Sequence, residues 1–98
     1  MAEQIQHLLL VILINNAMTI EEIIERTNDA LAQEFEVELS VFELEEDIKE
    51  TLELDSLALV DMVALLETEF GIQIKGTEIV SVKTFQNLYD FLATKINV

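Results

Sequence analysis

The segment DSLALVDMVALLETEFG, from Asp55 to Gly71, decides the fold because it has the features of one complete amphipathic helix. Asp55 or Ser56 can cap its start, and Gly71 can adopt the positive φ that ends a helix. Apolar side chains recur at spacings of three and four residues, which predicts a stripe facing a hydrophobic core. That stripe comprises Leu59, Met62, Val63, Leu66 and Phe70.

A second face of this helix mixes apolar side chains with carboxylates. It comprises Leu57, Val60, Asp61, Ala64, Glu67 and Thr68. If Leu57 and Val60 stay partly exposed beside negative charge, this face suits transient docking on a basic, partly apolar partner. Periodicity alone equally allows both side chains to widen the core stripe. The sequence leaves these two interpretations open.

The sequence before this helix predicts one more helix and a long loop. Thr19, followed three residues later by Glu22, matches a capping box and predicts a helix over about residues 20–35. Residues 36–54 alternate acids with apolar side chains, as a strand would over 36–44, but one unpartnered strand is marginal. We therefore expect a long loop whose apolar side chains pack on a helical core, and this loop can include a short turn of helix. Its length hints at function.

The chain after Gly71 predicts two helices. Thr77 can cap a short helix over 78–81, and Thr84 can cap a final helix that carries Phe85 through Ile96. The fold class is therefore all-α: a small four-helix bundle of three longer helices and one short helix, with a long loop between the first two. A chain of 98 residues allows one such domain. We assign residues 18–98 to it and residues 1–17 to an N-terminal apolar extension.

The extension contains seven consecutive apolar residues, Leu8 to Ile14. This run is too short to span a bilayer, and it lacks the positively charged start of a secretory signal. We expect no membrane span and a cytoplasmic location. The extension can be an added helix covering a groove or a tail outside the domain, and Met18 can be an alternative start. Nothing in the sequence decides between these possibilities.

The charge is strongly negative and unevenly distributed. Five basic and 20 acidic residues give a net charge of −15, and 13 acids face the single base Lys49 between Glu34 and Glu69. This charge opposes long-range attraction to nucleic acid or to anionic membranes, and partners should carry basic patches. The absence of Cys excludes disulfides and thiolate metal sites. Any thiol chemistry must come from a group attached to the protein.

Catalytic and metal-binding patterns are weak. A nucleophilic Ser56 would need a nearby base, and the only histidine is His7, in the extension. Glu45 and Asp47 lie in a highly charged loop, which favours a solvated surface over acid–base catalysis. A calcium loop starting at Asp47 would place Lys49 at a ligand position. We therefore predict a non-catalytic protein without a metal site.

Asp47 through Phe70, and more loosely Thr19 through Ile96, resembles an acyl carrier protein of the fatty-acid and polyketide type. The most specific element is Asp55-Ser56-Leu57 at the head of an acidic and apolar helix. Thr84-Phe85, which opens the last helix at the expected distance, supports the resemblance. The motif, the helix order, the acidity and the length together carry it.

The resemblance implies that Ser56 receives 4′-phosphopantetheine from coenzyme A through a Mg²⁺-dependent transferase, with Asp55 and Leu57 beside the attachment site. Acyl intermediates would then travel as thioesters on this arm in fatty-acid, polyketide or related lipid biosynthesis. The implied partners are a phosphopantetheinyl transferase and basic-patched enzymes such as ketosynthases and acyltransferases, and the carrier is expected to be a monomer. Implied partner-facing residues are Val60, Asp61, Ala64 and Glu67, and Ile74 and Ile79 are candidates for lining an acyl groove.

Three positions depart from the family pattern. Glu53 stands where the family usually has Gly, Ala58 where it often has an acid, and Ala64 where it usually has a partner-facing Met. These changes point to a dedicated carrier for a secondary product at least as readily as to the housekeeping fatty-acid carrier. An alternative of another class is an acidic, carrier-like interaction module that is never loaded.

Overall fold

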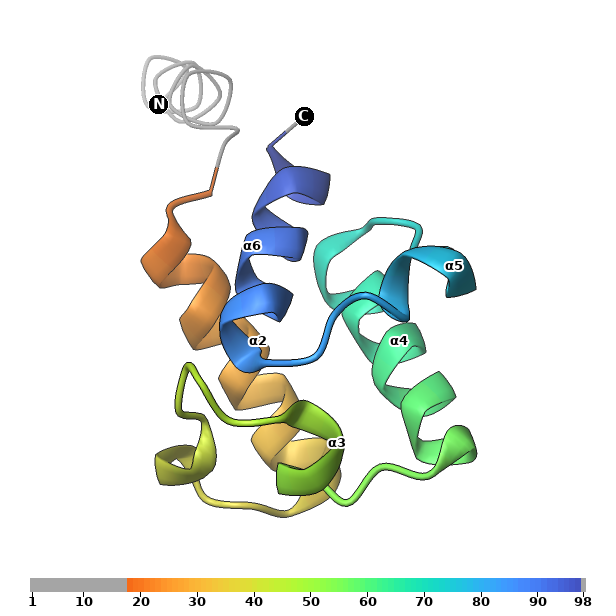
Figure 1. Cartoon of the computed structure of the whole chain (residues 1–98). Coiled ribbons are helices and arrows are strands. Elements are labelled where there is room, and N and C mark those ends of the chain that lie inside the picture. The colour runs from red at the N-terminus through yellow and green to blue at the C-terminus, as the bar shows by residue number, and fades with distance from the viewer. Residues whose placement is uncertain (1–17, 98) are drawn as a thin grey trace, which may run out of the picture.

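Three long helices build the domain. The computed structural model describes residues 18–97, so the predicted extension 1–17 and the last residue lie outside the described residues. The long helices are α2 (Ile20–Phe35), α4 (Ser56–Phe70) and α6 (Phe85–Ile96), and α2 packs against both α4 and α6 (Figure 1). Residues 18–97 contain no strand. The all-α class is therefore confirmed.

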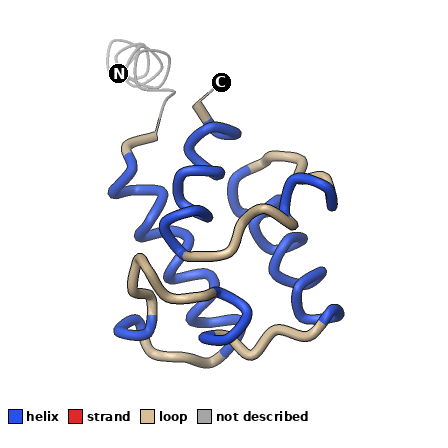
Figure 2. Tube along the Cα trace, viewed as in Figure 1, coloured by secondary structure: helices blue, strands red, loops and turns tan. Residues whose placement is uncertain are grey.

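The connection between α2 and α4 is a long loop that contains two short helices. These are the 3₁₀ helix η1 (Leu39–Val41) and the four-residue helix α3 (Ile48–Thr51), separated by irregular chain (Figure 2). Asp47 caps α3, because its carboxylate accepts a hydrogen bond from Glu50 N–H at 2.9 Å. Ile48, the first residue of α3, is buried in the core. The fold thus has the short α-helix α3 in addition to the four helices that the sequence predicts.

This loop is attached to the start of α6. Asp47 and Thr84 form an isolated antiparallel bridge, Ile48 N–H donates to Lys83 O at 2.8 Å, and Gln86 N–H donates to Leu44 O at 2.9 Å. The loop backbone is therefore paired without forming a strand. Val37 and Phe42 pack against the core, whereas Leu39 and Leu44 are exposed, so the alternating pattern of residues 36–44 does not mark one buried face.

The short helix α5 (Gly76–Ile79) begins two residues earlier than expected. Thr77 lies inside this helix and is exposed, so the predicted helix over 78–81 and its cap by Thr77 are wrong. The Glu78 carboxylate instead accepts a hydrogen bond from Lys75 N–H at 2.8 Å, which fixes the helix start at Lys75. This placement buries Ile79.

The other predicted helix ends are confirmed. The Thr19 hydroxyl accepts from Glu22 N–H at 3.2 Å, and Thr84 and Asn87 cap each other at the start of α6. Gly71 ends α4 with φ +64°, a conformation that glycine adopts without steric cost. These local interactions explain why most helix boundaries could be predicted from sequence.

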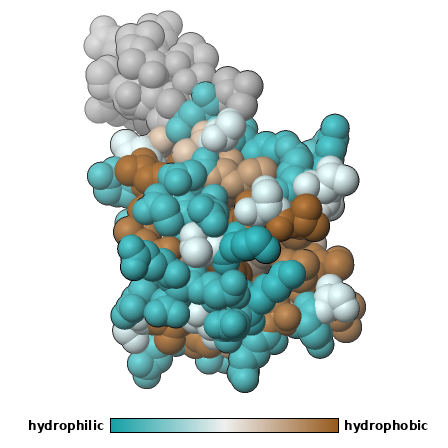
Figure 3. Space-filling view, viewed as in Figure 1, coloured by the Kyte–Doolittle hydropathy of each residue, from teal (hydrophilic) through white to brown (hydrophobic). Residues whose placement is uncertain are grey.

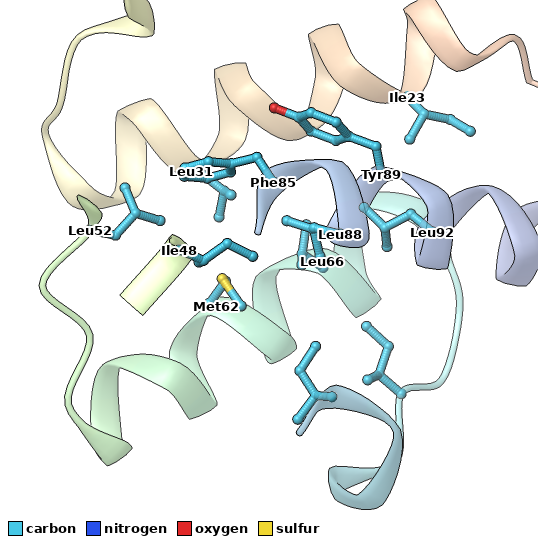
Figure 4. Close-up of a cluster of buried hydrophobic side chains, with 12 residues drawn as sticks. Ile23, Leu31, Ile48, Leu52, Met62, Leu66, Phe85, Leu88, Tyr89 and Leu92 are labelled. Atoms are coloured by element: carbon cyan, nitrogen blue, oxygen red, sulfur yellow. The ribbon is translucent and has the colours of Figure 1, made fainter. Parts of the chain in front are cut away.

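The core lies where α2, α4 and α6 meet (Figure 4). Two residues of the predicted α4 stripe, Met62 and Leu66, are fully buried, and its other members are partly buried against the core. Tyr89 is also fully buried, and its hydroxyl donates to Asn28 Oδ1 at 2.6 Å. Burial raises the pKa of Tyr89. The remaining fully buried apolar side chains are Ile23, Leu31, Phe85, Leu88 and Leu92.

Arg26 fastens α2 to the end of α4. Its Nη2 donates to the Glu69 carbonyl oxygen at 2.7 Å, and its Nε lies 3.1 Å from Glu69 Oε1. The guanidinium also lies over the Phe70 ring, 5.1 Å from its centroid. One side chain therefore satisfies a carbonyl of the last helical turn and fixes the contact between two helices.

Candidate functional site

Ser56 is the first residue of α4, and Asp55 places it there. Asp55 has extended backbone, and its carboxylate accepts a hydrogen bond from Ala58 N–H at 2.7 Å. This is an N-cap interaction, and the negative charge also favours the positive end of the helix. Asp55 therefore fixes the start of the helix and so the position of the serine beside it.

The Ser56 side chain is accessible. It is exposed, and no hydrogen bond to its hydroxyl occurs among residues 18–97. Within the same residues, no cluster of His, Cys, Asp or Glu side chains could hold a metal ion. An accessible alcohol at a helix N-terminus is a suitable place for a phosphate ester, because the local N–H groups and the helix dipole favour negative charge.

The mixed face of α4 extends from Ser56 along the helix. At about 100° per residue, Ser56, Leu57, Val60, Asp61 and Ala64 fall within an arc of about 140°. Leu57 is 73% exposed and Val60 62% exposed, so the alternative in which they widen the core stripe is wrong. Figure 3 shows apolar surface gathered on the side of the molecule where α4 and α5 lie.

Glu67 differs from the other acids of this face. It is half-buried, and its Oε2 accepts a hydrogen bond from Ile74 N–H at 2.9 Å. The carboxylate therefore holds the chain that follows α4, at the point where that chain turns toward α5. The sequence places Glu67 on the correct face but gives no sign of this structural role, because its partner is a backbone group seven residues away.

The segment around α5 is attached to the rest of the domain by two isoleucines and an ion pair. Ile74 and Ile79 are 8% and 7% exposed, so both side chains enter the core. Glu78 Oε2 lies 2.7 Å from Lys95 Nζ on α6. This hydrogen-bonded pair, together with Lys75 N–H, lowers the pKa of Glu78. The two candidate groove residues are thus carried by a short segment that one ion pair ties to α6.

Sequence reasoning missed one exposed apolar residue of this region. Val80 directly follows α5 and is 70% exposed. The predicted helix over 78–81 placed it inside a helix, whereas the helix ends before it. The hydrogen bond between Lys75 and Glu78 is the feature that sets where α5 begins.

None of the helices of residues 18–97 is long and apolar enough to cross a membrane.

A small helical bundle with an exposed serine at the start of an acidic and apolar helix defines the class of helical carrier domains. The family model described as a phosphopantetheine attachment site matches residues 25–92. This chain belongs to that family. It is therefore a non-catalytic acyl carrier, and 4′-phosphopantetheine is its covalently attached prosthetic group.

Similar proteins agree with this assignment. An acyl carrier protein of Petrotoga mobilis is 31% identical over 81 residues, which cover 83% of this chain and 95% of the relative. An acyl carrier protein of Thermosynechococcus vestitus is 33% identical over 79 residues, or 81% and 98% of the two chains. The polyketide-8 synthase acyl carrier protein 2 of Streptomyces avermitilis is 25% identical over 72 residues, or 74% and 83%.

Proposed function

We propose that Ser56 is the residue that carries 4′-phosphopantetheine. The observation that supports this most directly is the exposed Ser56 hydroxyl at the start of α4, inside the region matched by the family. The group, when bound, supplies the thiol on which acyl intermediates are held as thioesters. The protein's own contribution is positional, because the Asp55 cap fixes where the helix begins.

The proposed modification is a phosphoryl-type transfer onto Ser56. Ser56 Oγ forms a phosphoester bond, the pyrophosphate bond of coenzyme A breaks, and adenosine 3′,5′-bisphosphate leaves. The hydroxyl proton passes to a base that the transferase provides. We assign this step to a separate Mg²⁺-dependent transferase, as the resemblance to acyl carrier proteins implies.

Intact mass spectrometry tests the attachment site. After incubation with coenzyme A, Mg²⁺ and a broad-specificity phosphopantetheinyl transferase, the protein should gain the mass of one phosphopantetheine group, and Ser56→Ala should gain none. Ser40→Ala, which also removes an exposed serine, is the matched control and should be modified like the parent. No gain in the parent, or a gain that persists in Ser56→Ala, would refute the assignment.

We further propose that Leu57, Val60, Asp61 and Ala64 form the surface on which partner enzymes dock. Their exposure beside a formal charge of −15 supports this. Negative charge accelerates encounter with basic partners, and a small apolar anchor gives contact without a long-lived complex. Asp61→Lys should weaken binding to a ketosynthase or acyltransferase, whereas Ser56→Ala should abolish loading. An unloaded interaction module would instead bind its partners equally well without Ser56.

The pathway is a separate part of the proposal. Fatty-acid, polyketide or related lipid synthesis are the proposed settings, and Glu53, Ala58 and Ala64 point to a dedicated carrier at least as readily as to the housekeeping fatty-acid carrier. Ile74 and Ile79, which enter the core from the α5 segment, are the proposed lining of an acyl groove. The monomeric state and the cytoplasmic location stay predictions. Measuring the acyl group that co-purifies with the loaded protein would distinguish these pathways.

A further inference from the structure

Glu53, three residues before Ser56, has a backbone conformation that is unfavourable for any residue with a Cβ atom. Its φ is +53°, in the left-handed region. Only two non-glycine residues among those described have a positive φ, and the other is Glu36. This conformation brings Cβ close to the following carbonyl oxygen, so it costs an L-residue stability that glycine does not lose.

The hydrogen bonds around Glu53 explain why the conformation is needed. Leu54 N–H donates to Lys49 O at 2.9 Å, and Glu53 N–H donates to Glu50 O at 3.4 Å. This pair of bonds is a Schellman motif that ends α3, and Glu53 occupies the position where glycine is usual. The motif then directs the chain into the Asp55 cap and Ser56. The turn is therefore required, but a glutamate in it is not.

No contact within the described domain compensates for this strain. Glu53 is exposed, and neither of the two ion pairs of residues 18–97 involves it. The carboxylate of Asp55 is already used by Ala58 N–H, whereas that of Glu53 has no such bond within these residues. Glu36 is equally strained and exposed, so it is the position of Glu53 three residues before Ser56, and not the strain by itself, that points to a role in function.

The position of Glu53 indicates which partner meets it. Three virtual bonds of 3.8 Å limit the distance between the Cα atoms of Glu53 and Ser56 to about 11 Å. An enzyme that modifies the Ser56 hydroxyl must bring its own active site to that atom. Enzymes that process the acyl group meet the far end of the flexible arm instead, so they need not approach Glu53 as closely.

We propose that Glu53 is a specificity-determining residue for the modification of Ser56, and that its carboxylate binds a basic side chain of the phosphopantetheinyl transferase. This inference rests on the proposed attachment at Ser56. A carboxylate and a cation at such distances, near a protein surface, change association by roughly 2- to 10-fold. That interaction weakens at high ionic strength, which distinguishes it from a packing effect.

Initial rates of phosphopantetheine transfer test the proposal. The probes are the full chain, coenzyme A, Mg²⁺ and a broad-specificity phosphopantetheinyl transferase, at about 0.05 M and 0.5 M NaCl. Glu53→Gln keeps the strained turn and removes the charge, and it should lower kcat/KM roughly 2- to 10-fold at low salt only. Glu25→Gln removes a charge from an exposed position of another helix, α2, and should leave kcat/KM unchanged.

A second pair of variants separates strain from charge. Glu53→Gly and Glu36→Gly should each raise Tm by roughly 2 to 6 °C, because both relieve a left-handed glutamate. Only Glu53→Gly should also lower kcat/KM. This pair therefore measures the stability cost of the turn apart from the effect of the carboxylate on transfer.

The outcomes are distinct. Equal rates for the parent and Glu53→Gln, a loss that persists at 0.5 M NaCl, or an unchanged or lower Tm in Glu53→Gly would overturn the inference while leaving attachment at Ser56 intact. A parent protein that is not modified at all would overturn the proposed attachment, and with it this inference.

Discussion

The hydrogen bond from Ile74 N–H to Glu67 predicts that an acid of the mixed face of α4 also stabilises the fold. Glu67→Ala removes the acceptor that lies 2.9 Å from Ile74 N, and this bond is partly buried. Leaving such a donor unpaired costs about 1–3 kcal/mol. For a domain of this size each kcal/mol corresponds to about 4–8 °C in Tm, so a loss near 1.5 kcal/mol lowers Tm by about 6–12 °C.

Two variants on the same helix provide the comparison. Glu67→Gln retains a carbonyl oxygen that can accept from Ile74 N–H, so it should cost less than about 1 kcal/mol although it removes the same charge. Asp61→Ala also removes a charge, but Asp61 is exposed and its carboxylate is in neither ion pair of residues 18–97. It should change the free energy of unfolding by less than about 0.5 kcal/mol.

Urea unfolding and amide hydrogen exchange measure these effects. Exchange at Ile74 should accelerate in Glu67→Ala and remain close to the parent rate in Glu67→Gln and Asp61→Ala. If Glu67→Ala unfolds at the parent urea concentration with unchanged exchange at Ile74, the carboxylate does not hold this segment. Its role would then be confined to the surface.

Four other measurements test separate features. Arg26→Gln should lower the free energy of unfolding by about 1–2 kcal/mol, because it removes the contacts of Arg26 with Glu69 and Phe70 at the end of α4. A change below about 0.3 kcal/mol in urea unfolding would contradict this. Tyr89→Phe should cost about 1 kcal/mol, because it leaves the Asn28 side-chain oxygen without its hydrogen-bond donor. The pKa of Tyr89 is raised above 10.0 in the folded state, so the parent should lose stability as pH rises beyond 10.0. Thermal melts in alkaline buffer should show a smaller loss of stability in Tyr89→Phe. Lys95 lowers the pKa of Glu78 from 4.5, so the Glu78 carboxylate stabilises the fold above pH 4.5 and loses this effect as pH falls through its pKa in the folded state. Below pH 4.5 the Tm of Glu78→Gln should therefore fall less steeply with pH than that of the parent. Equal slopes of Tm against pH in the two proteins would argue against the ion pair. Repulsion within a charge of −15 should make Tm rise with NaCl or Mg²⁺, and a salt-independent Tm would show that this repulsion is not destabilising.

The helix ends that sequence reasoning placed correctly depend on neighbouring residues. Thr19 bonds a backbone group three residues away, Gly71 supplies its own positive φ, and Thr84 and Asn87 cap each other. Such contacts are present in the local sequence, so they can be read from it. The start of α5 was misplaced because Thr77 matched a capping pattern, while the interaction that forms joins Lys75 and Glu78.

The candidate site divides in the same way. The sequence alone determined the all-α class, the carrier family and Ser56 as the attachment residue to test, because a capped helix start and a charge pattern are local features. Only the tertiary structure decided that Leu57 and Val60 are exposed, that Glu67 holds Ile74, and that Glu53 has a left-handed backbone. Periodicity assigns side chains to a helix face, but burial depends on which elements pack there, and backbone strain depends on the turn that the packed elements require.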